Sequence, residues 1–461
     1  SALLSAEQIG ELRDEMGLNE SNEWDRFDAA TPAGILCNSR REALVRLPRD
    51  PRLAITVPQE VGIRTNKLMS SQEAFGRIVV DLSRNEEVRP YLVTTAPDVA
   101  TSTNLGGFIN RVGVFSATER RMWSEDPVMK WAEGPTGQHI ELGISEMNLF
   151  LLLGQLGLSW DLARQPLLPI GTVYDPFVLR GLDAFIYSVY SGARFVVAGT
   201  PSGVTLAPEG GAHQSTITPS VGMELPNVTY IEPTYAGALD WLLCDALGRI
   251  ADGPNQNPTA TPSEEGSYYF RLTTRPIDQE PFLAARDRLG EPVLRRQVLS
   301  GGYRLIDAFS SYPELVTIQS EGLRVPIVHL VSCGALMPEV IAASAELASE
   351  GVAAHVVDIT SSDRWYMAWQ RTIRQGVRTA TTPSIPGALR GVFLERAPIV
   401  TIQDGSSHAL AWLGSVFGVT GVSLGVDALG QSGAVSDLYE INDLQPGAIV
   451  NAALGALETQ G

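Results

Sequence analysis

The carboxylate of Glu146 is the first candidate for chemistry in this sequence. It lies where an extended segment flanked by glycines, 137–143, runs into a leucine-rich stretch, 149–158. A carboxylate at this point is expected to be largely buried, and burial raises a carboxyl pKa unless a partner holds the charge. Because buried carboxylates are rare without a reason, Glu146 is a functional candidate. The alternative is a helix N-terminal acid stabilised by backbone amides and the helix dipole.

Two more polar side chains lie where strands are expected to end. Asp98 follows the apolar stretch 90–95 and precedes a hydroxyl-rich turn, the usual place for ligand residues in an open α/β sheet. His213 lies near the end of a glycine-rich loop, 201–215, whose glycines allow close backbone approach to a ligand. The other histidines are expected to be hydrogen-bonded core residues or, for the last, part of a helix cap: His139, His329, His355 and His408.

The elements that must position these residues alternate between strand and helix. This alternation predicts an α/β fold of two doubly wound domains, with parallel sheets covered on both faces, preceded by an irregular N-terminal arm. The expected divisions are an arm or linker, a first domain, a second linker and a C-terminal α/β domain: residues 1–70, 71–280, 281–322 and 323–461. Within the arm, Ser5 and Gln8 form the capping-box pattern of a short helix. Residues 28–58 are expected to be extended.

Composition restricts the class of partner. The chain has 461 residues, 44% of them hydrophobic, and a net charge of −18, so it is expected to be soluble and to avoid nucleic acid and anionic membranes. No apolar run reaches the roughly eighteen residues of a membrane span, and no secretory signal pattern is seen. The cysteines, Cys37, Cys244 and Cys333, lack metal-binding spacing and predict core thiols in a reducing, cytoplasmic compartment.

The segment from Gly137-Gln138 to Gly143-Ile144-Ser145-Glu146 resembles one that carries the cofactor-activating glutamate of a known family. This family comprises the thiamine-diphosphate-dependent transketolases and 2-oxo acid dehydrogenase E1 enzymes, and the single-chain pyruvate dehydrogenase E1 is the most similar. There the glutamate hydrogen-bonds N1′ of the aminopyrimidine and favours the imino tautomer, which removes the C2 proton of the thiazolium. The resemblance implies this role for Glu146 and cofactor contacts for Leu142 and Ile144.

Further motifs follow in the order of the family. Phe177 matches an aromatic residue that stacks on the aminopyrimidine, and Tyr174 would line the same pocket, because a flat apolar ring suits a flat heteroaromatic one. On base rates of burial alone, Phe177 would instead be a core residue. His213 matches the histidine that orients substrate or shuttles a proton near C2. Asp98 matches a strand-end aspartate on the substrate side.

The family's metal motif, Gly-Asp-Gly followed by Asn, is not found in this sequence, and Gln403-Asp404-Gly405 is only a fragment of it. The resemblance therefore covers the aminopyrimidine-binding domain and the C-terminal domain. It implies that the diphosphate domain and the Mg²⁺ ligands belong to an α-type partner subunit in an α2β2 assembly. The chain would be the β-type subunit of an E1 enzyme that decarboxylates a 2-oxo acid and passes the acyl group to lipoamide on a lipoyl-bearing acyltransferase.

Two alternatives stay open. Val99 and Gln214 stand where the single-chain E1 has further acids and histidines, which favours a split transketolase or an acyloin-forming carboligase. A rival from another class is a non-catalytic subunit that only stabilises its partner. The polar stretch 114–136, directly before the glutamate segment, is either a lid that orders on binding or an ordinary surface loop.

Overall fold

The computed structural model describes residues 3–44, 55–120, 131–163, 165–252 and 266–459. The chain forms two units, Ser1–Arg52 and Leu53–Gly461, and each is considered by itself. Among the described residues, no helix is both long and apolar enough to cross a membrane.

The described part of the first unit, residues 3–44, contains two helices, α1 (Ala6–Glu15) and α2 (Pro32–Leu44). Helix α1 begins with the predicted capping box, because Ser5 and Gln8 each accept the other's backbone N–H with their side chains. The prediction of an extended arm is wrong over α2. Thr31 accepts the backbone N–H of Gly34 at 3.1 Å, and a proline is tolerated at the first helical position because its missing N–H has no partner there.

The first domain of the second unit is built on an eight-stranded sheet of parallel pairs, in the order β4-β3-β5-β2-β6-β7-β9-β8. Its strands are β2 (Leu92–Ala96), β3 (Val114–Phe115), β4 (Glu133–Gly134), β5 (His139–Glu141), β6 (Leu168–Val173), β7 (Val196–Gly199), β8 (Val228–Ile231) and β9 (Ser267–Arg271). Along β7, Val196 and Val197 point into different cores on opposite faces. Both faces are therefore buried, as the nearly continuous apolar strands predict.

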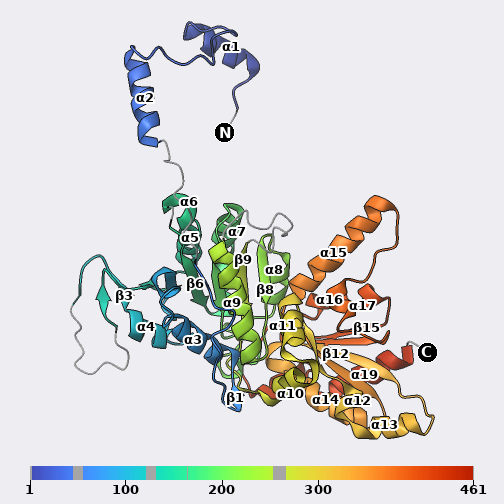
Figure 1. Cartoon of the computed structure of the whole chain (residues 1–461). Helices are drawn as coiled ribbons and strands as arrows, with labels where there is room; N and C mark the ends of the chain where they lie inside the picture. The colour runs from blue at the N-terminus through green and yellow to red at the C-terminus, as the bar shows by residue number, and fades with distance from the viewer. Residues whose placement is uncertain (1–2, 45–54, 121–130, 164, 253–265, 460–461) are drawn as a thin grey trace. The chain divides into compact units, whose positions relative to one another are not determined.

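Helices cover both faces of this sheet (Figure 1). On one face lie α3 (Ser71–Leu82), α4 (Gly106–Val112) and α9 (Ala236–Asp252). On the other lie α5 (Glu146–Gly157), α7 (Leu182–Tyr190) and α8 (Thr218–Glu224). Shorter helices are η1 (Arg89–Tyr91), α6 (Ser159–Ala163), η2 (Asp175–Gly181) and η3 (Ala207–Glu209).

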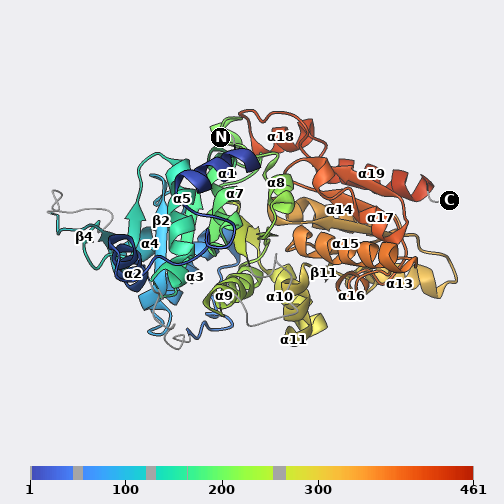
Figure 2. The ribbon, with the colours of Figure 1, turned by 90° about the horizontal axis from the view of Figure 1, so that it is seen from above.

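The second domain has a five-stranded sheet in the order β11-β13-β12-β14-β15, and it lies beside the first domain (Figure 2). Its strands are β11 (Tyr303–Ile306), which runs antiparallel, and β12 (Ile327–Ser332), β13 (Ala353–Asp358), β14 (Ile399–Ile402) and β15 (Gly421–Leu424). Helices α14 (Met337–Ser349) and α19 (Pro446–Thr459) cover one face, and α15 (Ser362–Thr379), α16 (Gly387–Arg390) and α17 (Leu413–Phe417) cover the other. The predicted doubly wound α/β class is confirmed.

The segment between the sheets is structured. A two-stranded ribbon, β1 (Leu68–Met69) with β10 (Ile277–Asp278), precedes helices α10 (Glu280–Leu289) and α11 (Glu291–Ser300). Residues 281–322, expected to be a linker, also contain β11 of the second sheet and helices α12 (Ala308–Ser311) and α13 (Pro313–Ser320). The remaining helices are η5 (Gly334–Leu336), η6 (Ser407–Ala409) and α18 (Val435–Ile441). The four-part domain division stays a prediction.

Some local predictions concern the surface. Cys244 and Cys333 are buried as expected, but Cys37 is exposed, so the prediction of a core thiol is wrong there.

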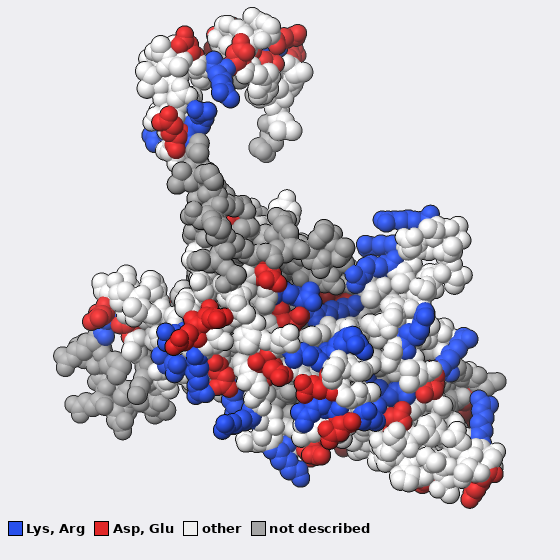
Figure 3. Space-filling view, viewed as in Figure 1, with Lys and Arg blue, Asp and Glu red and all other residues white. Residues whose placement is uncertain are grey.

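The stretch 114–136 contains β3 and β4, and residues 121–130 lie outside the described residues, so the lid stays a prediction. Acidic and basic side chains are interspersed over the face shown in Figure 3, with arginines along α15. No extended patch of one sign dominates that face.

Candidate active site

The predicted site residues follow four neighbouring strands of the first sheet. Asp98 follows β2, Glu146 follows β5, Tyr174 and Phe177 follow β6, and His213 lies in the loop after β7. The carboxyl ends of parallel strands meet at one edge of a sheet, so these loops emerge together. The rings of Tyr174, Phe177 and His213 form a cluster. The ring centroid of Tyr174 lies 6.0 Å from that of Phe177 and 5.9 Å from that of His213, and the centroids of Phe177 and His213 are 5.5 Å apart.

Glu146 is buried, with 8% of its surface exposed, as its place in the sequence predicted. It is also the first residue of α5, so it combines burial with a helix N-terminal position. The side chain of Ser145, the N-cap residue, makes no capping hydrogen bond. The Glu146 carboxylate instead accepts a hydrogen bond from Nη1 of Arg180, 3.2 Å from Oε1.

Arg180 joins Glu146 to the aromatic cluster. Its guanidinium carbon lies 3.6 Å from the centroid of the Phe177 ring, in cation–π contact. The sequence analysis did not identify this arginine. Its position three residues after Phe177, in the short helix η2, could have done so, because such a spacing places two side chains on one side of a helical turn.

Glu141, a second residue not predicted, fixes the backbone next to Glu146. Its Oε1 accepts the backbone N–H groups of Asp98, Leu142 and Gly143, at 2.8, 3.0 and 3.1 Å. Burial by itself would raise the pKa of Glu141, but hydrogen bonds from His139 and from the backbone hold it below its usual value. Glu141 thus ties the β2 turn that carries Asp98 to the segment that leads into α5.

The predicted cofactor contacts at Leu142 and Ile144 differ in environment. Leu142 packs against the apolar core beneath α5 and α7, whereas Ile144 is 79% exposed. Asp98 is also exposed, and its backbone has a positive φ of 63°. Ile144 and Asp98 therefore lie at the surface and Leu142 is half-buried, and the roles of all three stay predictions.

The glycine-rich loop that carries His213 contacts the second domain. Gly203 has a φ of +73°, and a side chain there would clash with the carboxylate of Asp404. A side chain at Gly211 would clash with the carbonyl oxygen of Gly430. The close backbone approach that these two glycines permit is therefore to the chain's own C-terminal domain, not to a ligand as expected from the sequence.

Asp404 anchors this loop. It is buried, and Oδ1 accepts the backbone N–H of Val204 at 2.8 Å while Oδ2 accepts that of Thr205 at 3.3 Å. The fragment Gln403-Asp404-Gly405 thus joins the two domains. Among the described residues, no group of three or more histidine, cysteine, aspartate or glutamate side chains is placed to hold a metal ion.

A fully buried arginine, Arg271 at the end of β9, lies under the site. Its Nε is 3.0 Å from the carboxylate of Asp175, and its Nη1 is 2.6 Å from that of Glu232. Burial opposes the charge of Arg271, but the two carboxylates keep its pKa above the usual value. Asp175, at the start of η2, also accepts hydrogen bonds from Tyr269, Ser215 and Thr218. This network fixes the turn that carries Phe177 and Arg180.

The remaining histidines are mostly structural. His139 is buried, with Nδ1 2.9 Å from the hydroxyl of Thr94, as expected for a core histidine. His329 and His355 are buried and hydrogen-bonded as expected, with Nε2 of His329 3.0 Å from the carbonyl oxygen of Glu395 and Nδ1 of His355 accepting the backbone N–H of Ala308 at 3.1 Å. The other ring nitrogen of each has no hydrogen-bond partner among the described residues. His408 lies within η6, and its Nε2 is 3.0 Å from the hydroxyl oxygen of Ser220.

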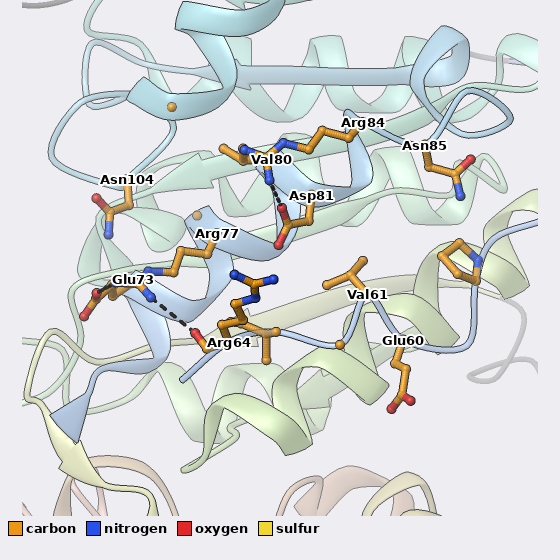
Figure 4. A pocket seen from close by; sticks show the side chains of 15 residues that line it. Glu60, Val61, Arg64, Glu73, Arg77, Val80, Asp81, Arg84, Asn85 and Asn104 are labelled. Carbon is orange, nitrogen blue, oxygen red and sulfur yellow. Dashed lines mark hydrogen bonds and ion pairs between the residues drawn. The ribbon is translucent and has the colours of Figure 1, made fainter. Parts of the chain in front are cut away.

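A cavity of about 930 Å³ lies away from this cluster, between residues 58–64 and α3 (Figure 4). Arg77 and Arg84 line it. Arg77 is paired with Glu73 within α3, and Arg84, just after the end of α3, is paired with Asp81. The predicted site residues, all of them described, are absent from its lining. The candidate active site is instead an open arrangement at the edge of the sheet.

Fold and site together define a class. A parallel α/β domain with a buried carboxylate and an aromatic cluster at its carboxyl edge, followed by a smaller α/β domain, has the architecture of the transketolase-like half of a thiamine-dependent enzyme. Residues 54–258 match the family described as pyruvate dehydrogenase E1 component middle domain.

Curated proteins that are similar to this chain are also pyruvate dehydrogenase E1 components. The chain is 21% identical over 412 residues to the pyruvate dehydrogenase E1 component of Escherichia coli K12. The matched residues make up 86% of this chain and 42% of that protein. It is 27% identical over 172 residues to the pyruvate dehydrogenase E1 component of Pseudomonas aeruginosa, 36% of this chain and 20% of that protein. The chain thus spans less than half the length of these two relatives. The resemblance to the thiamine-diphosphate-dependent transketolase and E1 family is confirmed, and the chain is related to these enzymes.

Solved structures show the same fold. The transketolase of Campylobacter jejuni superposes with a TM-score of 0.65 at 16% identity, covering 98% of this chain and 59% of that one. A split-gene transketolase, described as an inactive β4 tetramer, superposes with a TM-score of 0.51 at 18% identity, covering 85% of this chain and 99% of that one.

Proposed function

We propose that this chain is the β-type subunit of a thiamine-diphosphate-dependent 2-oxo acid dehydrogenase E1. It would decarboxylate a small 2-oxo acid and pass the acyl group to lipoamide. The match to the pyruvate dehydrogenase E1 middle domain supports the 2-oxo acid as substrate. The observation that carries the proposal is the buried carboxylate of Glu146 beside Phe177, bridged by one flat cation.

The residues present fit an aminopyrimidine. The chain's own guanidinium, which is planar and carries N–H donors, is held by Glu146 and stacked on Phe177. An aminopyrimidine is also planar and would use the same carboxylate and the same ring. When bound, thiamine diphosphate supplies the carbanion chemistry that decarboxylation needs, and the protein supplies position and electrostatics.

Each side chain then has a defined task. Glu146 would hydrogen-bond N1′, Phe177 would stack on the ring, and Tyr174 would line the same pocket. His213, whose ring lies 5.5 Å from that of Phe177, would orient the substrate or move a proton near C2. Asp98 would line the substrate side, with Leu142 and Ile144 beside the cofactor.

The diphosphate group and its Mg²⁺ would be held by a partner chain, an α-type subunit in an α2β2 assembly. Exposed apolar side chains support this part of the proposal. Those on and next to α5 and α7, here called the α5/α7 face, are Ile144, Met147, Leu151, Ile186, Tyr187 and Tyr190. Ile144 and Met147 flank Glu146 in sequence, so a chain that delivers the cofactor to Glu146 has to cover this face. Apolar surface of this kind marks interaction sites.

The test is to isolate the chain from its native cells with whatever co-purifies, and to analyse bound thiamine diphosphate. We expect a second chain with a diphosphate-binding motif, and 2-oxo acid decarboxylation that depends on a lipoyl domain. Buried thiols at Cys244 and Cys333 support a reducing, cytoplasmic location for this complex. A lone chain that binds neither cofactor nor partner would refute the proposal.

A split transketolase or an acyloin-forming carboligase is the second candidate, and two observations favour it. Val99 and Gln214 replace acids and histidines of the single-chain E1, and a split-gene transketolase shares the fold. Ketol transfer without any lipoyl domain would establish this candidate in place of the dehydrogenase. If Glu146→Ala left the assembled complex fully active, the chain would be a non-catalytic stabilising subunit.

A further inference from the structure

Arg180 contacts both groups that the proposed function assigns to the aminopyrimidine. Its guanidinium is 3.2 Å from the Glu146 carboxylate at one edge and 3.6 Å from the centre of the Phe177 ring at its face. A ring that stacks on this face of Phe177 while it hydrogen-bonds Glu146 would need the same space. The guanidinium and the cofactor therefore compete for one position.

We propose that Arg180 guards the aminopyrimidine subsite: its guanidinium takes the cofactor's place in the free chain and has to leave Glu146 and Phe177 before thiamine diphosphate binds. This inference rests on the proposed function of the site. It adds a residue that controls cofactor affinity and that needs no role in the chemical step.

The side chain of Arg180 is free to make this movement, whereas its backbone is not. More than half of the side chain, 55%, is exposed, so the guanidinium can swing into solvent. The next residue, Gly181, is buried, and a side chain there would clash with the ring of Phe150. The turn is also fixed by the buried Asp175 network. Entry of the cofactor thus requires a rotamer change of one side chain.

Competition between the Arg180 guanidinium and the cofactor lowers the affinity for the cofactor. Breaking a partly exposed ion pair changes an equilibrium constant by about 1.4-fold to fivefold, and breaking an exposed cation–π contact changes it by about twofold to fivefold. The observed affinity for the cofactor is reduced by the fraction of chains in which the subsite is open. Removal of the Arg180 side chain should therefore tighten cofactor binding by roughly threefold to thirtyfold.

The test is a calorimetric titration of the cofactor-depleted complex, as isolated with its partner, with thiamine diphosphate and Mg²⁺. We compare the wild type with Arg180→Ala and Arg180→Lys. Arg84→Ala serves as a control, because Arg84 is similarly exposed and ion-paired but lies two residues after the end of α3. Arg180→Ala should bind about tenfold tighter. Arg180→Lys should fall between, because lysine keeps the charge but loses the planar stacking.

The outcomes separate this inference from the proposed function. If the wild type binds the cofactor and Arg180→Ala binds it equally or more weakly, Arg180 is not a guard, and the proposed function still stands. If neither folded complex binds thiamine diphosphate, both are overturned. A gain in affinity shared by Arg84→Ala would also overturn the inference, because it would reflect net charge alone.

Discussion

The buried guanidinium of Arg271 donates a hydrogen bond to the backbone carbonyl of Asp404, with Nη2 2.6 Å from the oxygen. Arg271 ends a strand of the first sheet, and Asp404 follows a strand of the second. The same guanidinium is paired with Asp175 and Glu232, so one side chain joins the turn carrying Phe177 to the C-terminal domain. The geometry of the candidate site thus depends on contact between the two domains.

Arg271→Met should destabilise the chain strongly. It would leave the buried carboxylates of Asp175 and Glu232 without their cation, and breaking a buried ion pair from one side typically costs about 3–5 kcal/mol. Urea denaturation measures the loss. Arg84→Met, at an exposed pair, should change stability by less than about 1 kcal/mol. A loss below that size for Arg271→Met would show that the network does not hold the fold together.

Gly203→Ala should weaken the junction between the His213 loop and the second domain. The φ of +73° strains any side chain, and the new methyl group would meet the Asp404 carboxylate. Gly192→Ala is the matched control, because Gly192 has a φ of +86° but open space around it. Strain alone should cost about 1–3 kcal/mol in both variants. Thermal unfolding should show a clearly larger loss for Gly203→Ala, and equal losses would rule out the contact.

His329 should make stability depend on pH. Burial lowers its pKa to about 4, and neighbouring His355 and Arg304 act in the same direction. The unfolded chain therefore takes up a proton near pH 6.5 that the folded chain refuses until about pH 4, so His329 lowers stability as pH falls between these values. The difference in unfolding free energy between wild type and His329→Gln should change there by up to about 1.4 kcal/mol per pH unit. A difference that is constant from pH 7 to pH 4 would contradict this account.

Tyr190→Asp should weaken assembly with the partner chain. Tyr190 is 82% exposed on the α5/α7 face, so an added charge should leave the fold intact and disfavour only a complex that buries it. Aromatic anchors at interfaces are typically worth about 2 kcal/mol or more, which corresponds to a dissociation constant raised by roughly thirtyfold. Analytical ultracentrifugation measures this, with Val377→Asp on α15 as the control because Val377 is 79% exposed elsewhere. Unchanged assembly would place the partner on another face.

Much of the fold could be predicted because its strands and helices carry local signals. The apolar stretch 90–95, expected to form a strand that ends before Asp98, overlaps β2, since an apolar run followed by a turn marks a buried strand directly. Helix α2 was not predicted because residues 28–58 are rich in proline, arginine and aspartate and show little periodicity, although proline fits the first helical turn. The aromatic residues of α15 pack against Trp412, far along the chain, and sequence patterns do not reveal such contacts.

Part of the site could be predicted because its residues follow strands that the sequence indicates. Glu146, Phe177 and His213 each follow a strand, and parallel topology brings strand ends together. Arg180 left only its spacing of three residues from Phe177, and Arg271 left no comparable signal in the sequence. Their partners lie 34 and 133 residues away in sequence, and such long-range pairs depend on the folded arrangement. The contact between Asp404 of the second domain and the His213 loop could not be predicted for the same reason.

The central claim is that Glu146 activates bound thiamine diphosphate. The most direct measurement is the rate of hydrogen–deuterium exchange at C2 of the cofactor in the assembled complex, followed by NMR after acid quenching. Glu146→Gln keeps the size and one hydrogen-bond acceptor but cannot exchange a proton with N1′. We expect it to slow C2 exchange by roughly a hundredfold or more, with cofactor still bound. Exchange at the wild-type rate in Glu146→Gln would contradict the account.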